Sequence, residues 1–211
     1  MNRALFIAAG VVLLEALALA VTFPVLPAYV EGFGGHVAWA GVLMALATLP
    51  RIFTAPMWGK FADRFGRRII LQISTLGTLL SSVGWALALP MHQVFGIGLL
   101  WLAGSRLLLG LFGAQALLTQ AVASDVTTKD RRTAAMGMLG ASFGVAFSAG
   151  PAIGGLIAQH LGPWSVGITS ASLQGLSFLL ITWALRETRH RPEAEDASER
   201  AAPQVAKLRY G

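Results

Sequence analysis

Gly59-Lys60-Phe61-Ala62-Asp63-Arg64-Phe65-Gly66-Arg67-Arg68 separates two long apolar runs and carries four cationic residues, one acid and two glycines. Charged residues make up only 12% of the chain, whereas soluble domains average about 25%. A charged cluster of this density has to stay out of the hydrocarbon core, because a charge buried in lipid is costly. The stretch therefore predicts a loop at the membrane surface between two spanning helices.

The composition of the whole chain is that of a membrane protein. Of its 211 residues, 55% are hydrophobic and 24 are glycine. The formal net charge is +6, but the basic residues lie in the gaps between apolar runs, so we expect no nucleic-acid binding. The chain has no cysteine, and its four histidines lack metal-ligand spacing, so we expect no metal site and no cofactor. The sequence also lacks a phosphate-binding loop and a nucleophile triad, and we do not expect an enzyme.

Six apolar segments are long enough to cross a membrane, which takes about 20 residues. They cover residues 4–30, 37–58, 69–89, 94–123, 133–160 and 164–185. The sequence thus predicts an all-α membrane protein, in which residues 1–188 form one bundle of six transmembrane helices. The polar segment 189–211, of mixed charge, is expected to be a disordered cytoplasmic tail.

Lysine and arginine fall at alternate ends of the predicted spans. The loops 31–36, 90–93 and 159–163 contain neither residue. The opposite ends carry Arg3; Lys60, Arg64, Arg67 and Arg68; Lys129, Arg131 and Arg132; and Arg186, Arg189 and Arg191. Because basic residues favour the cytoplasmic side of a membrane, both termini are predicted to be cytoplasmic.

The glycines of the opening stretch predict a tight turn. Gly59 and Gly66 allow a close backbone approach or a positive φ, and Asp63 is placed to cap the helix that follows. The cations of the stretch would anchor the turn at the lipid headgroups: Lys60, Arg64, Arg67 and Arg68.

The pattern G-x-x-x-D-R-x-G-R-R over residues 59–68 resembles the loop between the second and third helices of major facilitator superfamily transporters. The resemblance implies that Asp63 and Arg67 form a charge cluster with an acid at the cytoplasmic end of the fourth helix, where this chain has Asp125. It also implies that the cluster latches the cytoplasmic side in one conformational state without binding substrate. By the same resemblance, we expect the protein to lie in a bacterial cytoplasmic membrane, in contact with its lipids.

The fifth predicted span contains a row of small residues. Gly150-Pro151-Ala-Ile-Gly154-Gly155 resembles the fifth-helix motif of drug/proton antiporters, and Gly140 and Gly144 extend the row of glycines. Small residues let membrane helices approach closely, and Pro151 is expected to kink the helix. The alternative is ordinary helix packing without a specialised role.

Two ionisable residues lie deep in predicted spans. Glu15 is about 18 Å from Arg3 along a helix, and Arg106 is roughly 20 Å from the outer end of the fourth span. Buried ionisable groups in membranes mark functional sites, so Glu15 is the natural protonatable or cation-binding group. Its position ahead of Pro24-Val-Leu-Pro27 resembles the first helix of the tetracycline-efflux group. The sequence around Arg106 resembles the family's R-x-x-x-G motif, which implies a part in proton coupling.

Arg51 in the second span adds a third charge within reach of mid-membrane depth. Glu15, Arg51 and Arg106 are therefore predicted to form one polar constellation, to which Gln115 and Thr119 add polar groups from the fourth span. The alternative is a structural Glu15 neutralised by one of the arginines. Ser81 stands near the place where the tetracycline-efflux group carries an aspartate, so tetracycline itself is not expected as the substrate.

The resemblance covers six of the twelve spans that are usual in the superfamily. The leading hypothesis is a half-size transporter that works as a homodimer and exports a lipophilic or cationic small molecule in exchange for protons. A second hypothesis is the N-terminal half of a split or truncated transporter, which needs a separate six-helix partner. A third is a membrane scaffold that transports nothing.

Overall fold

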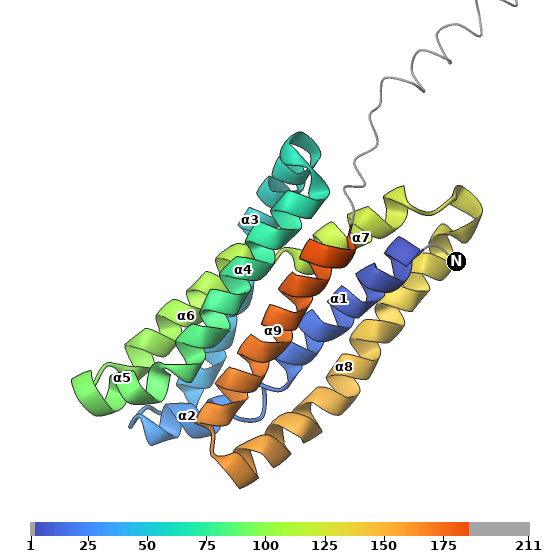
Figure 1. Ribbon diagram of the computed structural model, residues 1–211. Helices are drawn as coiled ribbons and strands as arrows, with labels where there is room; N and C mark the ends of the chain where they lie inside the picture. The colour runs from blue at the N-terminus through green and yellow to red at the C-terminus, as the bar shows by residue number, and fades with distance from the viewer. Residues whose placement is uncertain (1–2, 186–211) are drawn as a thin grey trace, which may run out of the picture.

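The computed structural model describes residues 3–185, and the predicted tail 189–211 lies outside the described residues (Figure 1). The described part is helical and contains no strand. Its elements are α1 (Arg3–Ala20), α2 (Leu26–Gly32), α3 (Ala38–Phe65), α4 (Arg67–Ala86), α5 (Ala88–Phe95), α6 (Gly98–Phe112), α7 (Gln115–Asp125), the 3-10 helix η1 (Lys129–Arg131), α8 (Arg132–Leu161) and α9 (Trp164–Ala184). Within residues 3–185, six helical segments are long and apolar enough to cross a membrane, which confirms the predicted all-α membrane fold.

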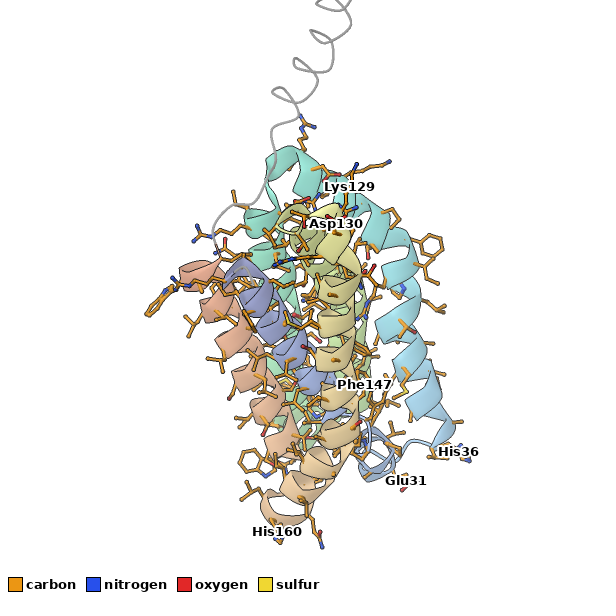
Figure 2. The ribbon with its side chains drawn as sticks, turned by 90° about the vertical axis from the view of Figure 1, so that its right-hand side faces the viewer. Glu31, His36, Lys129, Asp130, Phe147 and His160 are labelled. Carbon is orange, nitrogen blue, oxygen red and sulfur yellow. The ribbon has the colours of Figure 1, made fainter. Side chains whose placement is uncertain are left out.

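The helices form one bundle with α1 between α8 and α9 and with α4 beside α6 and α9 (Figure 1). The N-terminus and the end of α9 lie at the same end of the bundle. Lys129 and Asp130 lie at this end too, whereas Glu31, His36 and His160 lie at the opposite end (Figure 2). The loops without lysine or arginine therefore share one end, as the positive-inside argument requires; that the basic end faces the cytoplasm stays a prediction.

The first predicted span is not one helix. Residues 4–30 were expected to form a continuous span, but α1 ends at Ala20 and the separate helix α2 begins at Leu26. Proline disfavours helix at the residue before it, and Pro24 and Pro27 interrupt this segment. Pro27 lies at the start of α2, where its missing N–H costs no helical hydrogen bond.

The fourth predicted span, 94–123, is divided as well. α5 takes its first residues, α6 begins at Gly98, and the chain leaves helix at Gly113 and Ala114 before α7. At this break the Ala114 N–H donates to the Phe112 carbonyl at 2.8 Å. Ser74 of α4 adds to this bond, because its hydroxyl donates to the Phe112 carbonyl and accepts the Ala114 N–H at 3.3 Å. A broken helix is tolerated inside a membrane when neighbouring helices satisfy the freed backbone groups in this way.

The opening stretch is mostly helix, so the predicted loop between residues 58 and 69 is wrong in extent. α3 continues to Phe65 and α4 begins at Arg67, which leaves Gly66 as the turn, with φ 103° and ψ 140°. Gly59 lies inside α3, and a Cβ placed there would meet only Leu117 at 3.9 Å. Asp63 also lies within α3, and no side chain caps α4. Gly66 alone therefore performs the role expected of both glycines.

The exterior of the bundle is apolar and much of its interior is polar. Phe53 and Trp183 are 80% and 85% exposed, as residues facing lipid would be. Between the antiparallel helices α4 and α9, side chains pair layer by layer: Ser82 with Ser170 at 3.0 Å, Thr78 with Gln174 at 3.0 Å and Gln72 with Thr182 at 2.9 Å. Hydrogen bonds between helices take over part of the role that apolar burial has in water.

The glycines of α8 divide into two groups. A Cβ at Gly150 or Gly154 would collide with Ala20 or Val21 at the end of α1, so these glycines permit the predicted close packing. A Cβ at any of the other four would meet no described atom within 4 Å: Gly137, Gly140, Gly144 and Gly155. The helix continues without interruption across Pro151 to Leu161.

Candidate functional site

Helices α1, α3, α4, α6, α7, α8 and α9 line a cavity around Glu15. Glu15 and Arg51, the members of the predicted constellation from the first two spans, both line it. The lining also includes Thr78, Gln115, Thr119, Gln174 and, from α8, Phe143. The cavity therefore brings together four of the five residues that the sequence predicted for the proton and substrate site.

The Glu15 carboxyl group lies among hydroxyls and an amide. Thr75, Gln174 and Ser177 interact with it, and Arg51 supplies a positive charge. Glu15 and Arg51 do not approach within salt-bridge distance in the described part of the chain. The shielded Oε1 atom of Glu15 and the hydroxyls of Thr75 and Ser177 complete no hydrogen bond with a described residue. The carboxyl thus has a nearby cation and free hydrogen-bonding capacity, which suits a group that gains and loses a proton.

Two glycines leave the space that the Arg51 side chain needs to reach the cavity. A Cβ at Gly110 would lie 2.6 Å from the Leu46 carbonyl oxygen, so this glycine lets α6 approach α3. A Cβ at Gly113 would lie 2.7 Å from Nε of Arg51, so the guanidinium group occupies the space that Gly113 leaves open. The break between α6 and α7 therefore positions the cation.

Arg106 does not line this cavity, and its part in the predicted constellation stays a prediction. Its side chain is 6% exposed and lines two neighbouring cavities, one of which it shares with Arg51. Leu19 and Leu109 line both the Glu15 cavity and the adjacent Arg106 cavity. The guanidinium carbon lies 3.9 Å from the centroid of the Trp85 ring, a cation–π contact. Arg51, and not Arg106, is therefore the cation associated with Glu15.

Gln115 and Thr119 differ in what their side chains are free to do. Gln115 donates to the Thr78 hydroxyl at 2.7 Å, and Thr78 lies 3.0 Å from Gln174, which links the fourth span to the surroundings of Glu15. The Thr119 hydroxyl donates to the carbonyl of Gln115 in its own helix. Thr119 lines the cavity, but its donor is already used.

The charge cluster at the basic end brings together the residues that the resemblance singled out. Arg67 contacts Asp125 at 2.8 Å and Asp63 at 3.6 Å. The Asp125 side chain is 17% exposed and that of Asp63 is 73% exposed, so the inner pair is the better shielded from water. The contact joins α4 to α7; its role as a latch stays a prediction. Of the remaining cations, Arg64 lies over Phe65 and Arg68 donates to the Thr182 carbonyl.

The sequence argument missed four neighbours of the charged residues: Trp85, Thr75, Gln174 and Ser177. The last three had a signal, because Ser, Thr and Gln recur at helical spacing along both the third and the sixth span. Trp85 had none, since a tryptophan in an apolar helix is unremarkable. The described residues contain no group of three His, Asp or Glu residues that could hold a metal ion.

Residues 8–210 match the family model described as Major Facilitator Superfamily. The chain belongs to this superfamily. It is 35% identical over 199 residues to the tetracycline resistance protein, class E, of Escherichia coli, and 36% identical over 199 residues to the class B protein of the same organism. Each alignment covers 93% of this chain and 47% of the relative. The chain thus spans about half the length of these relatives.

A solved structure shows the same fold. The human organic anion transporter MFSD10 superimposes with a TM-score of 0.73 at 22% sequence identity, over 88% of this chain and 48% of that protein. At this identity the likeness concerns the fold alone. Family membership and the half-length match confirm the predicted relationship to one six-helix half of a superfamily transporter.

Proposed function

We propose that this protein is one six-helix bundle of a proton-coupled transporter that exports a lipophilic small molecule. The observation that carries the proposal is the cavity lined by both Glu15 and Arg51, inside a bundle whose exterior is apolar. Charges buried in a membrane are expensive, so a scaffold would gain nothing from keeping them. Export is suggested by the names of the relatives, which are resistance proteins.

We further propose that a second six-helix bundle completes the transport path. Superfamily transporters consist of two such halves, with the substrate site near the bilayer midplane between them. The exposed Ala116 and Gln120 of α7 and the open sides of Gly140 and Gly144 on α8 support an unfilled contact face here. Small residues on a membrane helix favour packing against another helix over contact with lipid.

The second bundle is proposed to be another copy of the chain. Both copies would then insert with the same orientation and each would contribute Glu15 to a shared cavity. Native mass spectrometry of the purified chain in lipid nanodiscs tests this: a dimer is expected. A stable monomer would contradict the homodimer and make a different six-helix partner the remaining source of the second half.

Proton coupling is tested with the full chain in liposomes that contain a pH-sensitive dye. A panel of lipophilic compounds that are cationic, neutral or anionic at pH 7 is added under a proton gradient. At least one is expected to trigger proton movement, and Glu15→Gln should abolish the response. Glu31→Gln, which changes an exposed acid at the opposite end of the bundle, is the matched control. A Glu15→Gln protein that responds like wild type would overturn the assignment and revive the scaffold hypothesis.

A further inference from the structure

Arg106 is an enclosed cation without an acid. Its side chain is 6% exposed, and it forms no salt bridge with a described residue. A guanidinium group has five N–H donors, yet Arg106 forms no hydrogen bond with the described part of the chain, and its Nε is shielded from the surroundings. The Trp85 ring stacked 3.9 Å away offers a π face, which attracts the charge but accepts none of these hydrogen bonds in the plane of the guanidinium group.

The cavity that Arg106 shares with Arg51 has apolar walls. Leu19, Phe23, Leu26, Met44 and Ala47 line it, with two threonines. Both threonine hydroxyls are already used within their own segments: Thr22 donates to the Leu19 carbonyl at 2.7 Å and Thr48 to the Met44 carbonyl at 3.0 Å. The two arginines are therefore the donors that this cavity leaves for a ligand.

The balance of charge in and around this cavity is positive. The residues that line the three adjoining cavities include two arginines and one acid, Glu15, which interacts with Arg51. The sum is +1 with Glu15 ionised and +2 with Glu15 protonated. An organic cation would be repelled here, whereas an anionic group with two adjacent acceptor oxygens matches the two-pronged geometry of a guanidinium group.

We propose that the transported molecule is an amphipathic organic anion whose carboxylate or sulfonate group binds Arg106. The cavity volume of about 70 Å³ takes this acidic group, and the apolar body extends past Leu19 and Met44 toward the exposed edge of the cavity. The inference rests on the proposed function and narrows its lipophilic substrate to an anionic one. The exposed Thr48 at the edge of the cavity marks a way in for a small ligand. Because Arg106 is enclosed by this bundle, an acidic side chain of a second bundle is the less suitable partner.

Equilibrium dialysis of radiolabelled benzoate against the full chain in nanodiscs at pH 7 tests this proposal. Saturable binding of benzoate is expected, with competition from benzenesulfonate and none from benzamide or benzylammonium, which have the same ring without the negative charge. Arg106→Gln should weaken binding about tenfold or more, the loss expected when a charge-assisted bidentate pair is removed. Arg106→Lys keeps the positive charge but not the two-pronged geometry, so its affinity for benzoate should lie between those of the wild type and Arg106→Gln.

Arg131→Gln is the matched control, because it removes one positive charge from the exposed 3-10 helix η1 and should leave benzoate binding unchanged. Circular dichroism and gel filtration establish that each variant is folded; if Arg106→Gln is not, the Arg106→Lys protein decides. Equal binding of benzamide, wild-type affinity in both Arg106 variants, or complete displacement of benzoate by chloride at equal concentration would each overturn the proposal. The measurement needs no proton gradient, so its failure is distinguishable from the failure of proton coupling.

Discussion

Arg67 at the start of α4 contacts Asp125 at the end of α7 at 2.8 Å, and both side chains are less than one-fifth exposed, at 18% and 17%. Asp63 lies 3.6 Å from the same guanidinium group but is 73% exposed. The two acids therefore share one cation under different degrees of screening, and the shielded pair is expected to contribute more than the exposed one.

Asp125→Asn should loosen the basic end of the bundle more than Asp63→Asn does. Each change removes one carboxylate charge, but the Asp125 change removes the carboxylate that lies closer to Arg67 and is better shielded from water. The natural chain contains no cysteine, so Ala116→Cys on α7 provides a single label site beside the cavity. Its maleimide labelling rate from the basic side should rise several-fold in the Asp125→Asn background. Equal rates in the two backgrounds would refute a latch at Asp125.

Ser74→Ala should destabilise the bundle by about 0.5–1.5 kcal/mol, the usual net contribution of an intramolecular hydrogen bond. The Ala114 N–H donates to the Phe112 carbonyl at 2.8 Å, and the Ser74 hydroxyl bonds to both groups at the helix break. Ser172→Ala is the control, since the exposed Ser172 hydroxyl donates within its own helix to the Ile168 carbonyl at 2.9 Å. Chemical unfolding in detergent micelles compares the two variants. A loss of stability in Ser172→Ala as large as that in Ser74→Ala would contradict a stabilising role of Ser74 at the helix break.

Gly113→Ala should displace the Arg51 guanidinium group from the Glu15 cavity, because the new methyl group would occupy its place. Proton movement in liposomes should then fall at least about tenfold, as a misplaced charge no longer stabilises ionised Glu15. Gly104→Ala is the control in α6, where a Cβ meets no described atom within 4 Å. Wild-type proton movement in folded Gly113→Ala protein would show that Arg51 takes no part in coupling.

Gly154→Ala should lower the stability of the single bundle, whereas Gly144→Ala should not. A Cβ at Gly154 would collide with the backbone of Val21, and overpacking of this kind costs about 1–3 kcal/mol. Gly144 faces open space, so alanine there keeps the bundle intact and adds helix propensity of up to about 1 kcal/mol. Thermal unfolding of the two variants checks the difference. Equal destabilisation would mean that α8 packs differently against α1.

Gly144→Trp tests the contact face separately from bundle stability. A bulky side chain at this open position should leave the unfolding of the bundle unchanged while it reduces association with a second bundle. The dimer fraction in nanodiscs, measured by native mass spectrometry, reports this. Trp183, which is 85% exposed on α9, offers the control Trp183→Ala on another face. A dimer fraction that falls with Trp183→Ala and not with Gly144→Trp would move the proposed interface to α9.

Local sequence patterns were sufficient for the architecture of the bundle. Apolar runs of membrane-spanning length predict helices, because in hydrocarbon the backbone N–H and C=O groups can form hydrogen bonds only with one another. The alternation of basic loops predicted which ends lie together, and Figure 2 shows Lys129 and Asp130 at one end and Glu31, His36 and His160 at the other. The interruptions at Pro24 and Pro27 also had a local signal, which the apolar run around them concealed.

Tertiary structure decided which of the two arginines lies near Glu15. Distance along a helix places Glu15 and Arg106 at similar depth but says nothing about the direction in which each side chain points. Helix rotation and the close approach at Gly110 and Gly113 bring Arg51 to Glu15, while Arg106 lies against Trp85. Depth follows from the rise per residue, which every helix shares. Contact between charges depends on how the helices pack, and that is a property of all six spans together.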